Sequence, residues 1–244
     1  MNRKHWAKGI ALAALAALGM GSARAVPINV ALGIVIDGSG SISATDFATQ
    51  KSAYAAVLGD PTIVPADGSV VINLVQFSSS AQLEQTAIRI SSEADRTTVL
   101  NAVNGMSQLG GLTNIGGGID LAVSDLDAFL AGIGASEFSA DFRKLIDVST
   151  DGFHNTGTDP ATATAAAIAA GYQAVNCLGI GAGADCSWND GNGTDFAATT
   201  FGDLQPVLER KLRFEITGEL PEPASLLLLG AGLAGLGFAR RRAA

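Results

Sequence analysis

An apolar run that ends in a short polar motif constrains the fold of this chain more than any other feature. Residues 30–36 are apolar and rich in β-branched side chains, which is typical of a strand buried on both faces. The sequence Asp-Gly-Ser-Gly-Ser follows directly and places Asp37, Ser39 and Ser41 at alternate positions of a turn. A carboxylate and two hydroxyls suit a hard cation such as Mg²⁺. The same residue types also build ordinary solvated turns, so the motif alone leaves both interpretations open.

Strand-like and helix-like segments alternate along the rest of the chain, which predicts parallel strands and helices on both faces of a sheet. The expected fold is therefore α/β, with a doubly wound, mostly parallel sheet. Residues 81–90 alternate between polar and apolar side chains, as expected of one antiparallel edge strand with a wet face. The expected strands are 28–36, 69–77, 81–90, 142–149 and 172–180, and the expected helices are 45–58, 92–106, 115–130, 161–170 and 204–212.

Two further segments carry oxygen-bearing side chains, one just before an expected helix and one just after an expected strand. A glycine-rich loop at 110–118 carries Thr113, and the strand-like run 145–150 ends at Asp151. In parallel α/β sheets, ligands bind outside the carboxyl ends of strands, near the point where the strand order reverses. We therefore expect Thr113 and Asp151 to lie at the same sheet edge as Asp37.

These three segments together resemble the von Willebrand factor type A (VWA) family and its metal-ion-dependent adhesion site. The pattern of that site is Asp-x-Ser-x-Ser, then a Thr, then an Asp, and it falls on Asp37, Ser39, Ser41, Thr113 and Asp151. The resemblance extends over residues 28–217. It implies that the serines bind Mg²⁺ directly, that the threonine binds in some states, and that the aspartates bind directly or through water. Mn²⁺ and Ca²⁺ are the alternative ions.

The resemblance implies a binding module rather than an enzyme. Its ligand would be a protein, or another molecule with an anionic group, that donates an acidic side chain to the metal. One alternative is a structural matrix or exopolysaccharide-associated component that the metal only stabilises. A metal-dependent hydrolase is the other, but the chain has no Gly-x-Ser-x-Gly motif and, after the first 25 residues, only His154 as a histidine base.

The first 25 residues have the pattern of a secretory signal peptide. Arg3, Lys4 and Lys8 precede an apolar stretch, and Ala23-Arg24-Ala25 provides small residues for cleavage. An uncleaved membrane anchor is the alternative interpretation. The signal predicts export by the Sec machinery and leaves residues 26–218 as the VWA domain.

The last 26 residues, 219–244, resemble the PEP-CTERM sorting signal of Gram-negative bacteria. Pro221-Glu222-Pro223 precedes an apolar segment at 224–239 and three arginines. The resemblance implies exosortase processing and a location at the cell surface or in the extracellular matrix, with transient membrane anchoring before sorting. The apolar segment is a marginal transmembrane helix by length, and a plain C-terminal anchor is the alternative.

Charge argues against nucleic acid as a partner. The formal net charge is −8, and the two terminal segments hold seven of the fifteen basic residues, so the central region is more acidic still. An acidic surface repels phosphate backbones and anionic membranes.

Two cysteines, Cys177 and Cys186, are the only ones in the chain. In an exported protein they are candidates for a disulfide, although two free thiols remain the alternative. A zinc site is not expected because too few ligands are present.

The remaining acidic residues and the histidine are expected at the surface. His154 follows Asp151 closely, at the rim of the metal site or in a solvated loop. Asp120 and Asp125 are expected on a solvated helix face, and the acidic stretch 185–195 leaves a calcium role open.

Overall fold

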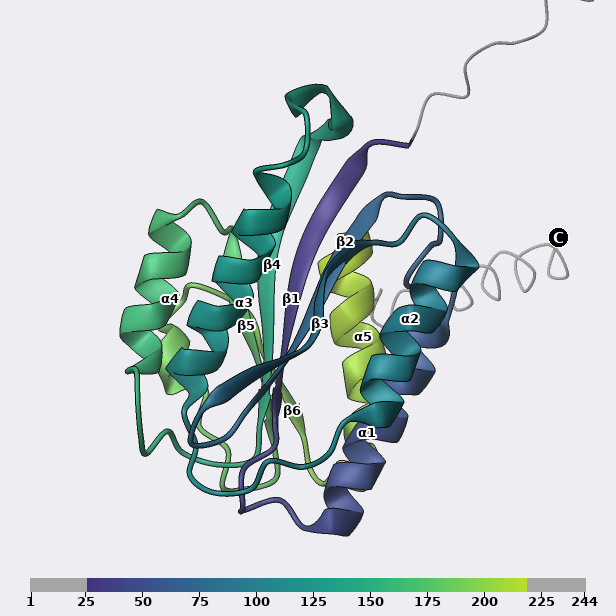
Figure 1. Cartoon of the computed structure of the whole chain (residues 1–244). Helices are drawn as coiled ribbons and strands as arrows, with labels where there is room; N and C mark the ends of the chain where they lie inside the picture. The colour runs from purple at the N-terminus through teal and green to yellow at the C-terminus, as the bar shows by residue number, and fades with distance from the viewer. Residues whose placement is uncertain (1–25, 219–244) are drawn as a thin grey trace, which may run out of the picture.

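A six-stranded sheet lies between two layers of helices in the computed structural model, which describes residues 26–218 (Figure 1). The expected signal peptide and sorting signal lie outside these residues. The strands are β1 (Ile28–Asp37), β2 (Val70–Phe77), β3 (Ala81–Arg89), β4 (Phe138–Thr150), β5 (Ala174–Ile180) and β6 (Asp195–Ala198). The α-helices are α1 (Ala44–Gly59), α2 (Glu93–Gly105), α3 (Ile115–Leu130), α4 (Pro160–Ala169) and α5 (Leu204–Thr217).

The strand order is β3-β2-β1-β4-β5-β6, and only the pairing of β2 with β3 is antiparallel. This confirms the expected mostly parallel sheet with an antiparallel edge. The chain leaves β1 toward β2 on one side and later returns to pair β4 on the other. The carboxyl ends of β1 and β4 therefore flank the point where the strand order reverses, at the lower edge of the sheet in Figure 1.

Residues 30–36 of strand β1 are apolar without interruption because both faces of the strand are covered there. Leu32, Ile34 and Ile36 pack with the helices α1, α2 and α5. The residues between them, including Ala31 and Val35, pack with α3 and α4 on the other face. Side chains of a strand alternate between the faces of a sheet, so two hydrophobic layers require apolar residues at nearly every position.

The structure corrects the expected bounds of α5 and β4 and adds a strand, β6. Helix α5 continues to Thr217, since Leu208, Leu212 and Ile216 extend one buried stripe beyond the expected end at residue 212. Strand β4 begins at Phe138, four residues early, with an irregular pairing to the start of β1. The short edge strand β6 lies in a stretch where we expected no strand, because four residues are too few to show the alternation of side chains along a strand.

Three ionisable side chains are fully buried between α5 and the sheet. Lys211 on α5 places its Nζ 2.6 Å from Oδ1 of Asp147 on β4 and 2.5 Å from Oε1 of Glu215 on its own helix. Asn176 on β5 donates a further hydrogen bond of 2.8 Å to Glu215. Burial, with the nearby Asp147 carboxylate, raises the pKa of Glu215 to about 8.

We expect this raised pKa to make stability depend on pH. The folded chain holds the Glu215 proton up to about pH 8, whereas an unfolded glutamate releases it near its model value of 4.5. Stability is thus full below 4.5 and falls as the pH rises toward 8, with a slope approaching about 1.4 kcal/mol per pH unit. Urea unfolding of the protein and of Glu215→Gln at pH 5 to 9 tests this. The difference in unfolding free energy between the two should shift steadily in favour of the variant, and a constant difference would contradict the expectation.

Cys177 on β5 and Cys186 form a disulfide, with 2.03 Å between the sulfur atoms. The bond closes the loop after β5, in which the indole of Trp188 is buried. The backbone N–H of Asp185 in this loop donates 3.3 Å to the carbonyl oxygen of Gly152. The two cysteines are therefore paired, as predicted, and their bond holds in place a loop that contacts the segment after Asp151.

Candidate metal centre

The carboxyl end of β1 begins a continuous chain of polar contacts that reaches β4. Oδ1 of Asp37 accepts a hydrogen bond of 2.8 Å from the backbone N–H of Ser39. The hydroxyls of Ser39 and Ser41 lie 3.0 Å apart, and Ser41 donates 2.6 Å to Oδ1 of Asp151. Asp37 and Ser39 are fully buried, whereas Ser41 is exposed. Four predicted site residues from two distant segments thus lie together, with one edge open to solvent.

Thr113 lies in the loop before α3 and is tied to the segment that follows Asp151. Its backbone N–H donates 2.8 Å to Oδ1 of Asn155, and the N–H of Asn155 donates 3.0 Å to the carbonyl oxygen of Thr113. Thr113 is only 4% exposed. These reciprocal bonds hold the loop of Thr113 against the loop that follows Asp151.

Glycines bring the loop before α3 onto the turn after β1. The N–H of Gly110 donates 2.8 Å to the carbonyl oxygen of Gly38, and the N–H of Gly40 donates 2.9 Å to that of Gly111. Gly110 and Gly111 have φ of +68° and +91°, which side chains with a Cβ rarely adopt. A Cβ on Gly38 would lie 2.0 Å from Oε1 of Gln76, so this approach also requires glycine.

Thr150 belongs to the site, although we did not predict it. Its hydroxyl donates 2.7 Å to Oδ2 of Asp37, so the Asp37 carboxylate accepts one hydrogen bond on each oxygen. The signal available in the sequence is position alone: Thr150 directly precedes Asp151 at the end of a strand that pairs with β1.

Three glutamines support the site and were also missed. Gln50 on α1 donates 2.8 Å to the carbonyl oxygen of Asp37. Gln108 donates 3.0 Å to that of Ser39, and Oε1 of the buried Gln76 accepts 2.8 Å from the N–H of Leu109. A polar residue within the apolar strand β2 was the one visible signal for Gln76.

The negative charge at the site has no cationic partner within residues 26–218. No Lys or Arg in that range forms an ion pair with Asp37 or Asp151. Burial raises the pKa of Asp37 to about 6, although the hydrogen bonds from Ser39 and Thr150 oppose this. A buried carboxylate without a counter-charge is costly, and a bound cation would supply that charge.

The donor set fits a hard cation. The described residues contain no group of three or more His, Cys, Asp or Glu side chains that together suit a metal. The site instead offers two carboxylates with serine and threonine hydroxyls, all of which are oxygen donors. Mg²⁺ and Mn²⁺ favour oxygen ligands, whereas structural zinc sites mostly use cysteine and histidine.

Other predicted residues lie apart from this chain of contacts. His154 is half-buried with its Nδ1 unpartnered, and Asp120 is exposed as expected. The expectation for Asp125 was wrong, because its Oδ2 accepts hydrogen bonds of 2.9 Å from Asn73 and 2.7 Å from the N–H of Ala87. Polar groups on β2 and β3 turn this helix position inward. In the stretch 185–195, Asp185 and Asp195 bond within their own loop, to Ser187 and Asn189.

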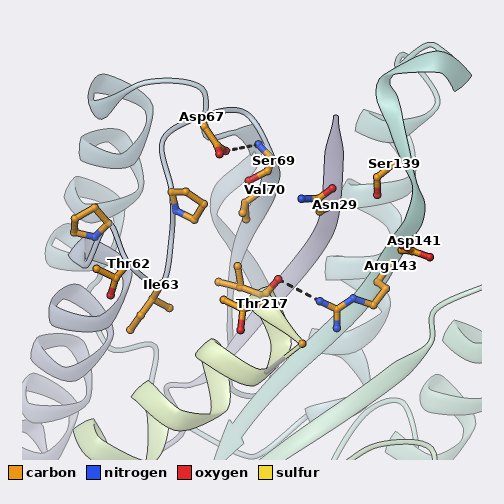
Figure 2. A pocket seen from close by; sticks show the side chains of 14 residues that line it. Asn29, Thr62, Ile63, Asp67, Ser69, Val70, Ser139, Asp141, Arg143 and Thr217 are labelled. Carbon is orange, nitrogen blue, oxygen red and sulfur yellow. Dashed lines mark hydrogen bonds between the residues drawn. The ribbon is translucent and has the colours of Figure 1, made fainter. Parts of the chain in front are cut away.

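A pocket of about 690 Å³ lies at the opposite edge of the sheet (Figure 2). Asn29, Val70 and Ser139 line it from the amino ends of β1, β2 and β4, and Thr217 and Gly218 line it from the end of α5. Arg143 reaches from β4 toward the end of α5 and donates to the carbonyl oxygen of Ile216. None of the predicted site residues borders this pocket.

Residues 32–195 match the profile of the von Willebrand factor type A domain, over more than half of the chain. The chain belongs to the VWA family. Residues 219–242 match the PEP-CTERM protein-sorting motif. The VWA match and the sorting motif together indicate an exported adhesion or matrix module of a Gram-negative bacterium, with exosortase processing.

Two solved structures share this fold, and one further protein is similar in sequence over part of the chain. Proximal thread matrix protein 1 from the mussel byssus, in a structure with a zinc-occupied metal-ion-dependent adhesion site, has 20% identity and a TM-score of 0.63, covering 79% of this chain and 48% of that one. A von Willebrand factor type A structure from Catenulispora acidiphila has 19% identity and a TM-score of 0.60, covering 78% and 43%. The human collagen alpha-6(VI) chain is 33% identical over 91 residues, which are 37% of this chain and 4% of that protein.

This VWA chain therefore spans less than half the length of these proteins. VWA domains typically bind protein ligands and are typically non-enzymatic. Within residues 26–218, no helix is both long and apolar enough to cross a membrane. The expected transmembrane segment at 224–239 lies outside that range.

Proposed function

We propose that this protein is an exported module that binds a protein ligand through a divalent cation, with Mg²⁺ as the physiological ion. Ser39 and Ser41 would bind the ion directly, Thr113 in some states, and Asp37 and Asp151 would supply the negative charge. The observation that carries the proposal is the unbroken contact chain from Asp37 through Ser39 and Ser41 to Asp151, which spans 110 positions of sequence between its last two members.

The combination of charged and neutral donors would allow the site to bind a ligand as well as an ion. Two carboxylates match the formal charge of a divalent ion, but where they bind through water they leave the direct coordination positions to neutral hydroxyls and solvent. Ser41 is exposed and Asp151 is half-buried, so the ion would lie close to solvent at that edge. Hydroxyl ligands and an open edge favour recruitment of one more anionic oxygen, such as the carboxylate of a ligand protein. Thr150 and the three glutamines would hold Asp37, Ser39 and the loop before α3 in place around the ion.

Titration calorimetry with Mg²⁺ and Mn²⁺, combined with thermal melting, tests the metal site. We expect one ion per chain and a rise in melting temperature that EDTA reverses, since a ligand that binds only the folded state stabilises it. A titration without heat, together with a melting temperature that neither ion shifts, would contradict the proposal.

A matrix component that the metal only stabilises is the second candidate. The mussel thread protein among the structural relatives is a matrix protein by name, which favours this candidate. In that case EDTA would lower the melting temperature, but the domain would capture no carboxylate ligand in the presence of Mg²⁺. Binding experiments with and without EDTA separate the two functions.

A further inference from the structure

Large apolar side chains are exposed at four positions within residues 26–218, and three of them lie in the two loops that carry Thr113 and Asp151. Leu109 is 37% exposed, Leu112 is 52% exposed and Phe153 is 63% exposed. The fourth, Val26, precedes β1 at the opposite edge of the sheet. Single exposed apolar residues are common on protein surfaces, but their gathering around one site indicates a contact surface.

The backbone holds these three side chains beside the site. Leu112 directly precedes Thr113, and Phe153 follows Asp151 by two positions. The reciprocal hydrogen bonds between Thr113 and Asn155 join the two loops.

Leu109 lies at the other end of the same glycine loop. Its N–H donates to Gln76, and the next residue, Gly110, donates to the turn after β1. Loops at the open edge of a sheet are usually polar, because an exposed leucine or phenylalanine gains nothing from water. We call Leu109, Leu112 and Phe153 the apolar rim.

We propose that the apolar rim selects a protein ligand whose metal-binding carboxylate is flanked by large apolar residues. This rests on the proposed function, because the ion binds the carboxylate of the ligand and the apolar rim then contacts the residues on either side of that carboxylate. A ligand of that kind buries its flanking side chains against Leu112 and Phe153 while its acid reaches the ion.

Charge favours the same ligand over an acidic polysaccharide. The chain carries a formal net charge of −8, so a polymer with many carboxylates meets repulsion around the site. A ligand with a single acid between apolar residues brings one negative charge, so it meets less repulsion than such a polymer. Sugar acids also carry hydroxyls next to the carboxylate, which an apolar rim cannot satisfy.

Short synthetic peptides test the inference in the presence of Mg²⁺. Acetyl-Gly-Leu-Glu-Phe-Gly-amide is compared with acetyl-Gly-Ser-Glu-Ser-Gly-amide, with the glutamine form of the first peptide, and with oligogalacturonate. Calorimetry measures each dissociation constant, and separate titrations with the metal alone measure ion binding. We expect the Leu-Glu-Phe peptide to bind at least about tenfold more tightly than the Ser-Glu-Ser peptide, and the glutamine form not to bind.

The variant Leu112→Ser with Phe153→Ser is expected to reduce this preference to within about twofold, while ion binding and melting temperature stay unchanged, because exposed side chains contribute little to folding. Val26→Ser is the matched control, since it removes an exposed apolar side chain far from the site and should keep the full preference.

Several results would overturn the inference while leaving the metal site intact: equal binding of the two peptides, no binding of either, binding of the glutamine form, a preference that survives in the double variant, or tighter binding of oligogalacturonate. Failure of the parent protein to bind the ion would instead overturn the proposed function, and the inference with it.

Discussion

Replacing Asp37 with asparagine is expected to lower the affinity for Mg²⁺ at least about a hundredfold. The substitution removes one of the two carboxylates while keeping the shape of a fully buried side chain. It also disturbs an arrangement in which both oxygens accept hydrogen bonds, from Ser39 and from Thr150, because an amide has only one oxygen. Calorimetric titration with Mg²⁺ measures the loss, and circular dichroism confirms that the variant is folded.

Asp120→Asn is the matched control for this experiment. Asp120 is an exposed carboxylate on α3, outside the chain of contacts that joins Asp37 to Asp151. It removes the same charge from the protein, so its titration should equal that of the parent. An Asp37→Asn protein that binds the ion normally would show that this carboxylate supplies no charge to a metal.

Replacing Lys211 with methionine is expected to lower the free energy of unfolding by about 3–5 kcal/mol. Methionine keeps the length and most of the volume of the side chain, so the effect isolates the charge. The ammonium group is the only cation paired with the buried carboxylates of Asp147 and Glu215 within residues 26–218. Glu215 already holds its proton at pH 7, so loss of the ammonium group leaves the buried Asp147 carboxylate without a counter-charge. Urea unfolding at pH 7 measures the change.

Arg213→Met provides the control on the same helix. Its guanidinium lies 3.5 Å from Glu209 in a partly exposed pair near the surface, and surface pairs contribute about 0–1 kcal/mol. If the two variants lost similar amounts of stability, the buried position of Lys211 would not be the cause.

Local patterns predicted most of the fold because each strand of the sheet centre is covered on both faces. The apolar run that became β1 and the alternation in β3 are direct consequences of burial, and a sequence displays burial well. The missed elements are those whose stability comes from neighbours. Strand β6 has four residues and forms by pairing with β5, while the inward position of Asp125 depends on Asn73 and Ala87, which no local pattern connects to it.

The candidate site divides in a similar way. Asp37, Ser39 and Ser41 share one turn, and Thr113 and Asp151 follow from the family pattern, so all five were predicted. Thr150 and the glutamines are different, because each acts through one hydrogen bond to a group far away in sequence. Gln50 and Gln108 occupy a helix and a loop where glutamine is ordinary, so only the folded arrangement assigns them to the site.

The pocket that both ends of the described chain border has a mechanical consequence. Asn29 and Gly218 lie at the edge of the sheet opposite Asp37 and Asp151. A tether fixed after Gly218 would leave the ion-binding pole pointing outward from the surface that holds it. Tension between a captured ligand and such a tether would enter through the end of α5 and pull that helix along its own axis, so the apolar packing of Leu208, Leu212 and Ile216 would carry the load.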